Sequence, residues 1–497
     1  MKRRFLSSIV IWVILLTICS HKPLLSQETQ DQTFNPEKRF SVGQLKQDFL
    51  LLKKALEEGH AGLYRYTPKK ELDDHIEAIG KELNRSMTEY EFYRMLVPLI
   101  AHIHDGHTRI SLSEAFDKYL SDQSILFPFN LRILKKKAYL FRNYSSTPEI
   151  PMGSELLSIN SHPLCVIIQQ MLPFIPNDAH IQTSKYRSLE RTAFFGRLFN
   201  LIFGPSSSYE MSYRDRETNN SKKITVAGIK AKDLNSILDA RYPEAAKENP
   251  PIQLDYRKDI AILTVRTFGM GPYQTAKISY PTFLKNAFQE LEDKKIQHLI
   301  IDLRDNGGGA DAYGKILLQH LIDRPFQYYE HLRINKTEFS FFEHTNIPPN
   351  ERIQNPNRFR KNNDGTFDLL FHPNLGEQKS IPPIFQGKVY VLINGSSFSG
   401  TGECTSLIHF HKKAVFIGEE CGSGYYGNTS GFMPLLTLPH TKIRVRIPMI
   451  RYTMAVSGYA KDRGIIPDYP VSPTIDDLLN GRDTVMEFTI DLIQNDL

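Results

Sequence analysis

Cysteine is scarce in this sequence, with four residues among 497. One of them, Cys19, lies in a leader-like N-terminus, so an exported chain would keep Cys165, Cys404 and Cys421. Because three thiols form at most one disulfide, a disulfide framework is excluded as the basis of the fold. The sequence leaves open whether Cys404 and Cys421 are paired.

An excess of one charge is also missing. The chain has 61 Lys and Arg residues against 55 Asp and Glu, a formal net charge of +6 over its whole length. No basic stripe alternates with aromatic residues, which argues against nucleic acid as a partner. The segment "HIHDGH" (102–107) lacks the HExxH pattern and an obvious third ligand, so we predict no metal site and no cofactor.

The hydrophobic N-terminal run is too short for a stable membrane span. It covers about residues 9–18, follows the basic residues 2–4 and precedes a small residue, Ser26. This order is typical of a secretory signal peptide over residues 1–26 and predicts an exported protein, periplasmic or extracellular. An uncleaved anchor is the alternative and would be the membrane contact. A lipoprotein is less favoured, because the residue before Cys19 is too bulky for a good lipobox.

The composition is that of an ordinary globular protein, with 41% hydrophobic and 23% charged residues. A chain of this length has room for two or three domains. Apolar residues recur at helical spacing over about residues 41–100, where Thr88 and Glu91 can form a capping box, and this predicts a helical module over residues 35–112. Short alternating segments follow and predict a small β-rich domain over residues 113–245.

Beyond Pro251 strands alternate with helices. Strands are expected at 259–268, at 297–304, in "KVYVLING" and in "AVFIGEE", with helices between them. This alternation implies a mainly parallel sheet covered by helices and predicts an α/β core over residues 251–475. Residues 323–386 lack periodicity and are expected to be an irregular insertion, hypothetically a lid. Residues 476–497 are expected to form a C-terminal helix.

The segment "VLINGSSFSGTGE" (391–403) places several hydroxyl groups where a buried strand turns into a helix. Ser399 then lies at the helix N-terminus, where unpaired amides and the helix dipole favour a developing negative charge. These features suit a serine nucleophile with the Gly400 amide as an oxyanion donor, although a plain N-cap serine has the same pattern. Ser396 and Ser397 stay open as alternatives.

The segment "IIDLRDNGGGAD" places three glycines, Gly307 to Gly309, between a buried strand and a helix. Glycines in this position let the backbone approach a ligand with its amides free, which predicts an oxyanion hole. A phosphate loop is excluded because no GK[ST] follows, and the glycine spacing of a dinucleotide site is absent. A plain turn is the alternative.

A serine hydroxyl needs a base, and histidine is the side chain with a suitable pKa. In "HIHDGHTRI" we favour His107, at the junction between the helical and β-rich regions, over His102 and His104. Asp462 of "KDRGIIPDYPV" is the candidate acid that would orient the histidine, with Glu419 as its rival.

Four segments in this order resemble the C-terminal processing (tail-specific) serine peptidases: "LIIDLRDNGGG", "VYVLINGSSFSGTGE", "VFIGEECGSGYYGN" and "GIIPD". The resemblance implies an α/β crotonase-like (ClpP/crotonase) catalytic core, and "GSELLSINSHPL" resembles part of a degenerate PDZ-like domain. Those peptidases use a Ser–Lys dyad whose lysine aligns with Gly424 of this chain. The "DGHT" segment and the missing lysine resemble instead the tricorn-core-like branch, which has a Ser/His arrangement in place of the dyad.

The residues and the resemblance together predict an exported serine peptidase that hydrolyses peptide bonds through an acyl-enzyme. Its substrate would be a peptide or an unstructured protein. The roles implied are nucleophile for Ser399, general base for His107, orienting acid for Asp462 and oxyanion donors for Gly400, Gly308 and Gly307. The alternative is a non-catalytic ligand- or peptide-binding protein of the same fold, which the missing lysine favours. Export argues against acyl-CoA chemistry, and the oligomeric state stays open.

Overall fold

The computed structural model describes residues 34–246, 249–351 and 355–495. The predicted signal peptide, residues 1–26, lies outside the described residues. From Pro36 onward the chain forms one compact unit. No helix in the described part of the chain has the length and apolar character needed to cross a membrane.

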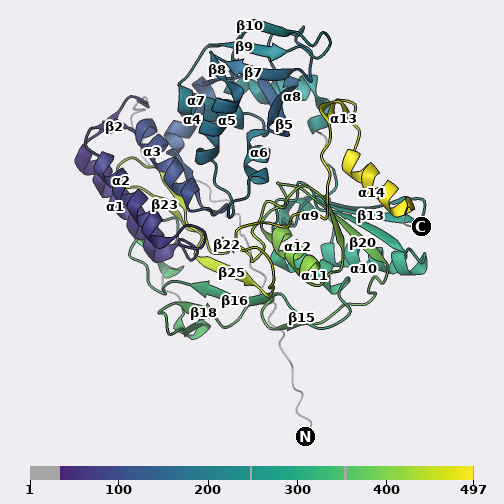
Figure 1. The fold of residues 1–497 in the computed structure, drawn as a ribbon. Coiled ribbons are helices and arrows are strands. Elements are labelled where there is room, and N and C mark those ends of the chain that lie inside the picture. Colours follow the sequence, from purple (N-terminus) through teal and green to yellow (C-terminus); the bar gives the residue numbers. More distant parts are fainter. Residues whose placement is uncertain (1–33, 247–248, 352–354, 496–497) are drawn as a thin grey trace. The chain divides into compact units, whose positions relative to one another are not determined.

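A six-stranded sheet lies at the centre of the C-terminal half (Figure 1). Its strands, in spatial order, are β12 (Ile252–Arg257), β13 (Ile260–Val265), β14 (His298–Asp302), β20 (Lys388–Ile393), β21 (Val415–Gly418) and β26 (Tyr469–Pro470). β12 is antiparallel to β13, and the other neighbours are parallel. Every residue of β14 is buried, as expected for a central parallel strand that is covered on both faces.

Successive side chains of these strands point to opposite faces, so each face of the sheet has its own layer of helices. On one face, residues such as Ile301 pack with the helices α10 (Tyr280–Asp293), α11 (Asp311–Gln319) and α12 (Gly400–Phe410). On the other face, residues such as Ile300 pack with α14 (Thr484–Asn495). The predicted alternation of strands and helices is confirmed.

The carboxyl ends of β14, β20 and β21 lie at one edge of the sheet, because these parallel strands pair in register. Asp302 pairs with Leu392, and Ile393 pairs with Gly418. Segments that follow the carboxyl ends of neighbouring parallel strands come together, and ligand sites are commonly built there. The glycine-rich segment after β14 and the serine-rich segment after β20 are therefore neighbours.

Three helices form most of the N-terminal region: α1 (Val42–Gly59), α2 (Lys69–Glu82) and α3 (Glu89–His102). The predicted capping box is confirmed, since the Thr88 and Glu91 side chains each accept a hydrogen bond from the other residue's amide. These helices share their core with a small sheet of β23 (Leu435–Thr437), β24 (Arg444–Arg446) and β3 (Arg109–Ser111). Because β3 leads out of the histidine segment, this sheet helps to place that segment.

The β-rich region is an antiparallel sheet with the strand order β10-β9-β7-β6-β5, in which β8 pairs with β7. Its strands are β5 (Phe129–Leu134), β6 (Lys137–Asn143), β7 (Glu155–Ile159), β8 (His162–Pro163), β9 (Ser208–Arg214) and β10 (Ser221–Ala227). The helices that share its core are α5 (Leu164–Met171), α6 (Thr183–Leu189) and α7 (Phe194–Phe203). The alternating pattern predicted the strands but not these helices, because short buried helices lack a distinctive period.

The expected irregular insertion, residues 323–386, contains paired strands, so that expectation is corrected. β16 (Tyr329–Ile334) pairs with β25 (Ile450–Met454) in a sheet that also contains β17 (Phe359–Lys361), β18 (Phe367–Leu369) and β22 (Thr429–Ser430). Phe341 and Phe342 are buried in the core of the N-terminal helices. The order comes from partners distant in sequence, which local periodicity does not reveal.

The remaining helices and strands of the described residues are short. They are β1 (Arg39–Phe40), β2 (Met87–Thr88), α4 (Glu114–Gln123), β4 (Ile125–Leu126), β11 (Ile229–Lys230), α8 (Leu234–Arg241), α9 (Met270–Ala276), β15 (Phe326–Gln327), β19 (Glu377–Gln378) and α13 (Ile475–Leu479). The C-terminal helix expected from residue 476 is therefore divided into α13 and α14.

Candidate active site

Ser399 occupies a strained turn between β20 and α12. Its backbone has φ 58° and ψ −126°, a region that residues with a side chain rarely adopt and that costs about 1–3 kcal/mol. The turn is held by hydrogen bonds from the Ser399 amide to Ser423 Oγ (2.7 Å) and from the Phe398 amide to the Asn306 carbonyl (3.0 Å). A sharp strand-to-helix turn of this kind presents a serine hydroxyl at the N-terminus of the helix.

His107 reaches Ser399 from the N-terminal region. His107 Nε2 lies 2.9 Å from Ser399 Oγ, although 292 positions separate the two residues in the sequence. The Phe398 ring stacks on the imidazole with 4.7 Å between ring centroids, and Arg446 Nε donates to the His107 carbonyl at 2.9 Å. The structure therefore brings together the serine and the histidine that the sequence singled out, at the distance that a nucleophile and its base require.

Burial sets the protonation of His107, of which 7% is exposed. Burial lowers the pKa of the imidazole to about 4; Asp105 opposes this effect, and the positive charges of Arg446 and Arg109 reinforce it. The imidazole is therefore neutral near neutral pH. A neutral ring has one unprotonated nitrogen, and with the hydrogen on Nδ1 the Nε2 atom can accept the Ser399 proton.

The predicted orienting acid does not hydrogen-bond to His107. His107 Nδ1 is buried and has no hydrogen-bond partner among the described residues. Asp462 instead uses its backbone, since its carbonyl accepts a hydrogen bond from the His180 amide at 3.1 Å. The assignment of Asp462 is therefore corrected, because its peptide group rather than its carboxylate makes the contact with the neighbouring segment.

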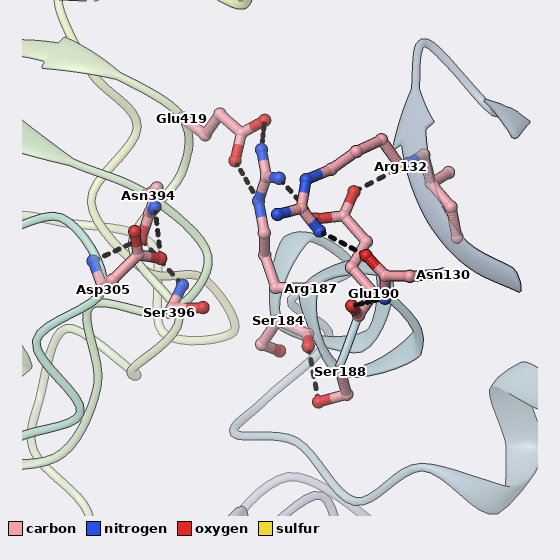
Figure 2. A network of polar contacts seen from close by, with 11 residues as sticks. Asn130, Arg132, Ser184, Arg187, Ser188, Glu190, Asp305, Asn394, Ser396 and Glu419 are labelled. Carbon is pink, nitrogen blue, oxygen red and sulfur yellow. Dashed lines mark hydrogen bonds and ion pairs between the residues drawn. The ribbon is translucent and has the colours of Figure 1, made fainter. Parts of the chain in front are cut away.

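The rival acid, Glu419, is engaged elsewhere. The Arg187 guanidinium binds both oxygens of Glu419, at 3.0 and 2.5 Å, and also binds Glu190 at 2.7 Å (Figure 2). Arg187 comes from α6 of the β-rich region and Glu419 directly follows β21 of the core. This ion pair joins the β-rich region to the core, so the role of Glu419 is structural.

Asp105 is the acid whose charge acts on His107. Its Oδ1 accepts hydrogen bonds from the amides of His107 (3.0 Å) and Thr108 (2.8 Å) and from the Thr108 hydroxyl (2.9 Å). Burial works to raise the pKa of Asp105, but His60, His107 and the Thr108 hydrogen bonds outweigh it and hold that pKa below its usual range. Sequence analysis missed this residue. The sequence did contain a signal for it, because an Asp two positions before the histidine can accept hydrogen bonds from the amides that follow it.

The glycine-rich segment lies against the Ser399 turn. Gly308 has φ +90°, and a Cβ there would lie 2.6 Å from the Phe398 carbonyl oxygen and 2.7 Å from Ser399 Cβ, so the position requires glycine. The Gly308 amide is not free, because it donates to Asn306 Oδ1 at 3.0 Å. The prediction of Gly308 as an oxyanion donor is therefore corrected: its backbone provides close packing rather than an open N–H group.

The amides of Gly309 and Gly400 are open. Neither donates a hydrogen bond to any residue in the described ranges. A Cβ built on Gly400 would lie 3.6 Å from the Gly309 nitrogen, so the two glycines are neighbours. Gly307, which was also predicted, is exposed as Gly309 is, and no hydrogen bond within the described ranges occupies its amide, so its role as a donor stays a prediction. The geometry therefore offers the Gly400 and Gly309 amides as candidate oxyanion donors, in place of the engaged Gly308 amide.

The alternative serines have other surroundings. Ser397 is fully buried, and its hydroxyl donates to the Leu303 carbonyl at 2.8 Å. Ser396 lines a cavity of about 670 Å³ at the carboxyl edge of the sheet, which is lined by neither Ser399 nor His107. Charges of both signs line this cavity: Arg132, Arg187, Arg191, Arg266, Arg304 and Arg482, with Glu190, Asp302, Asp305, Glu419 and Asp483. Several of them pair with one another (Figure 2), so the cavity is not strongly selective for one charge.

The alternative histidines also have other partners. His102 Nε2 lies 3.1 Å from Glu71 Oε1. The His104 ring packs edge-on against His180 with 4.5 Å between ring centroids, and burial lowers the pKa of His104 to about 4. Of the three candidate bases, His107 is the one that hydrogen-bonds to Ser399.

The described residues contain neither a disulfide nor a cluster suited to a metal ion. Cys165, Cys404 and Cys421 are free thiols, which answers the question of pairing. Within the described ranges no three or more His, Cys, Asp or Glu side chains are placed so that they could hold a metal ion together.

Residues 259–471 match the model of peptidase family S41. The matched residues contain the α/β core, so the core of this chain is similar to the peptidases of that family. The resemblance to the C-terminal processing peptidases is thereby confirmed. This similarity supports serine peptidase activity, with peptides or proteins as substrates.

Solved structures are similar to this chain over most of its length. Mature CPAF complexed with lactacystin has a TM-score of 0.62 at 16% identity and covers 91% of this chain and 97% of its own. A putative peptidase from Parabacteroides merdae has a TM-score of 0.47 at 14% identity, covering 90% and 96%. The photosystem II D1 C-terminal processing protease has a TM-score of 0.39 at 12% identity, covering 86% and 93%. The similarity to CPAF shows a shared fold. No protein with a curated description matches the chain.

Proposed function

We propose that this chain is an exported serine peptidase that hydrolyses peptide bonds through an acyl-enzyme. The contact of 2.9 Å between Ser399 Oγ and His107 Nε2 carries the proposal. A buried neutral imidazole beside a serine with strained backbone suits nucleophilic catalysis, whereas such strain contributes nothing to folding.

The proposed reaction uses the two side chains in turn. Ser399 Oγ attacks the carbonyl carbon of the scissile bond while His107 Nε2 takes the hydroxyl proton. The imidazolium then gives this proton to the leaving amine, the C–N bond breaks, and the acyl group stays on Ser399 as an ester. A water molecule attacks the ester with His107 as the base, which releases the carboxylic acid and restores the serine hydroxyl.

The oxyanion of each tetrahedral intermediate would be received by the Gly400 and Gly309 amides. Both amides are open, the two glycines are neighbours, and Gly400 begins α12, whose N-terminus favours negative charge. Loss of one such donor typically lowers the rate about 10²–10³-fold. Gly309 takes the place of the predicted Gly308, whose amide donates to Asn306, and Gly307 stays a predicted donor.

The packing at Gly424 supports histidine rather than lysine as the base. This position aligns with the dyad lysine of the C-terminal processing peptidases, and a Cβ there would lie 2.4 Å from Tyr66 Oη. A lysine side chain therefore has no room unless Tyr66 moves. We accordingly propose the Ser/His arrangement of the tricorn-core-like branch for this chain.

The alternative function is a non-catalytic ligand- or peptide-binding protein of the same fold. One observation favours it: His107 Nδ1 has no acidic partner in the described structure, so no third residue orients the imidazole through that atom. The Ser399–His107 contact and the two open amides favour the peptidase, because a binding pocket requires neither.

Labelling of the mature protein with a fluorophosphonate probe separates these functions. Wild type is expected to react, and Ser399→Ala and His107→Ala are expected not to react. Ser396→Ala, in the same turn, and His102→Ala, in the same segment as His107, are matched controls and should react at the wild-type rate. A folded wild-type protein that does not react contradicts the peptidase proposal and favours the binding protein.

The proposal includes the finer architecture and the location. The helix-covered parallel sheet supports a crotonase-like core, and the sheet formed by β5 to β10 supports a PDZ-like domain that binds a peptide by strand pairing. Export rests on the predicted signal peptide. N-terminal sequencing of exported protein is expected to begin at Gln27, and an intact N-terminus in the membrane fraction would favour the uncleaved anchor.

A further inference from the structure

A second buried carboxylate, Asp178, lies between the two halves of the candidate site. It belongs to the β-rich region, in the segment that leads into α6, and it is 1% exposed. Burial of an ionised carboxylate is costly unless hydrogen-bond donors surround it. The donors to Asp178 come from the histidine segment on one side and from the segment after β21 on the other.

Towards the histidine, Asp178 Oδ1 accepts a hydrogen bond from the Gly106 amide at 2.8 Å. The next residue, Ala179, donates its amide to the His104 carbonyl at 3.0 Å, so two consecutive residues hold this segment. A Cβ on Gly106 would lie 3.0 Å from Asp178 Oδ1 and 2.6 Å from the Phe398 ring. Because Gly106 directly precedes His107, this contact constrains where the imidazole lies.

Towards the serine, Asp178 Oδ2 accepts hydrogen bonds from the Ser423 hydroxyl at 3.3 Å and from the Gly424 amide at 3.4 Å. Ser423 Oγ in turn accepts the Ser399 amide at 2.7 Å. This amide belongs to the residue with the strained backbone. The carboxylate is therefore linked through one hydroxyl group to the peptide unit that directs the Ser399 side chain.

We propose that Asp178 is a positioning residue: its carboxylate sets the separation of His107 and Ser399, through Gly106 on one oxygen and Ser423 on the other. The inference rests on the proposed peptidase function. A carboxylate suits this role because both of its oxygens accept hydrogen bonds and neither donates. An amide in the same place has one acceptor and would direct an N–H group at another donor.

The electrostatics agree with a carboxylate that is retained at a cost. Burial raises the pKa of Asp178 to about 7, and the nearby Asp105 carboxylate acts in the same direction. The amides of Gly106 and Gly424 and the Arg65 guanidinium oppose this rise. A neutral side chain would avoid the cost, but it could not accept from all three donors.

Inactivation kinetics with the fluorophosphonate separate probe affinity, KI, from the rate of the chemical step, kinact. Asp178→Asn is expected to lower kinact about 10–100-fold with KI changed less than about threefold, because a misplacement of about 1 Å costs about 10²-fold in rate. Ser423→Ala cuts only the link to Ser399 and should lower kinact about tenfold. The double variant should be no slower than Asp178→Asn, since both changes act through one network.

Asp48→Asn is the matched control, because Asp48 has a similar environment far from Ser399 in the sequence and the fold. Asp48 is fully buried and accepts hydrogen bonds from the amides of His440 and Thr441 and from the Thr441 hydroxyl. Its substitution should lower Tm about as much as Asp178→Asn and leave kinact unchanged. Equal losses of kinact in the two variants would overturn the inference, since they would show a purely structural effect.

Amide hydrogen exchange tests the inference independently of activity. A wild type that is not labelled contradicts the proposed function alone, and exchange then decides the role of Asp178. In Asp178→Asn the Gly106 and Ser399 amides should lose protection, whereas in Asp48→Asn the His440 and Thr441 amides should do so. Should Asp178→Asn fail to fold, Ser423→Ala tests the serine link, with lost protection expected at Ser399. Unchanged protection of Gly106 and Ser399 overturns the inference.

Discussion

The two halves of the candidate site are built in different ways. The serine half, residues 391–403, is a continuous strand, turn and helix, and Leu303 and Asn306, which hold its turn, directly follow the neighbouring strand. The histidine half, residues 103–108, is a segment without regular structure between α3 and β3. It is held by Asp178 of the β-rich region and by Arg446 of β24.

This difference separates what a local pattern can specify from what it cannot. A strand followed by Asn-Gly, hydroxyl residues and glycines already indicates a tight turn into a helix, so the nucleophile can be recognised from nearby residues. The histidine is positioned by groups far away in the sequence. A local pattern offers three histidines in this segment and gives weak grounds for choosing among them.

Removal of either half should abolish the activity to the same extent. Ser399→Ala and His107→Ala are each expected to lower peptide hydrolysis by about 10⁴-fold or more, and the double variant should be no slower, because the two groups act as a unit. Turnover of an unstructured peptide measures this, with thermal unfolding as the test of folding. If His107→Ala keeps most of the activity, the histidine half is not needed for catalysis and another group acts as the base.

Gly308→Ala should damage the serine half selectively. The new Cβ meets backbone atoms of Phe398 and Gly400 at 2.6 and 2.8 Å, at a residue with φ +90°. We expect a loss of about 3–4 kcal/mol in the free energy of unfolding, from strain of about 1–3 kcal/mol and overpacking of a similar size. Chemical denaturation measures the loss. Gly307→Ala is the control, since it faces open space and should change stability by less than about 0.5 kcal/mol.

The histidine half should respond to acid. The pKa of His107 is lowered to about 4 in the folded state, against about 6.5 in the unfolded state. The fold is therefore fully stable with respect to this group above pH 6.5. As the pH falls from 6.5 to 4, the unfolded state binds a proton more readily than the folded state, and the free energy of unfolding decreases. At pH 4 the loss is about 3 kcal/mol. The pH dependence of unfolding in wild type, compared with His107→Gln, should show this difference. The labelling rate should fall in two steps, first as Asp178 takes up a proton near pH 7 and then as His107 does so near pH 4. In Asp178→Asn the first step should be absent, and a decline centred near 6.5 in that variant would contradict a buried base.

The smallest effects are expected for the two alternative serines. Ser397→Ala removes two hydrogen bonds of its hydroxyl, one donated to the Leu303 carbonyl and one accepted from the Asn394 amide, and should cost about 1–2 kcal/mol in the free energy of unfolding. Ser396→Ala should change it by less than about 0.5 kcal/mol. Both variants should be labelled like wild type. If either variant remains folded but is no longer labelled, the substituted serine rather than Ser399 would be the nucleophile.

Much of the fold was predictable because its pattern is local. The strands of the core are short apolar runs bounded by turn residues, and the helices between them repeat at helical spacing. The helices α5 to α7 escaped prediction because they are short and buried. The strands within residues 323–386 escaped because their partners, such as β25, lie more than a hundred residues away and leave no local period.

The site was predicted in part for the same reason. Ser399, Gly400 and His107 lie together, whereas Asp462 presents its peptide group and Gly308 uses its amide internally. Asp105 was overlooked although it stands next to Gly106 in the quoted motif. Asp178 had no signal at all, since an isolated acid in a segment between helices is indistinguishable from a surface residue.

The sequence by itself determined the α/β alternation, the strained serine turn and the glycines against which it packs. These features depend on the conformational preferences of adjacent residues. The tertiary structure decided which histidine meets the serine, which amides remain open and which carboxylates lie nearby. Those choices depend on contacts between segments up to hundreds of positions apart, and such contacts exist only once the separate cores have packed together.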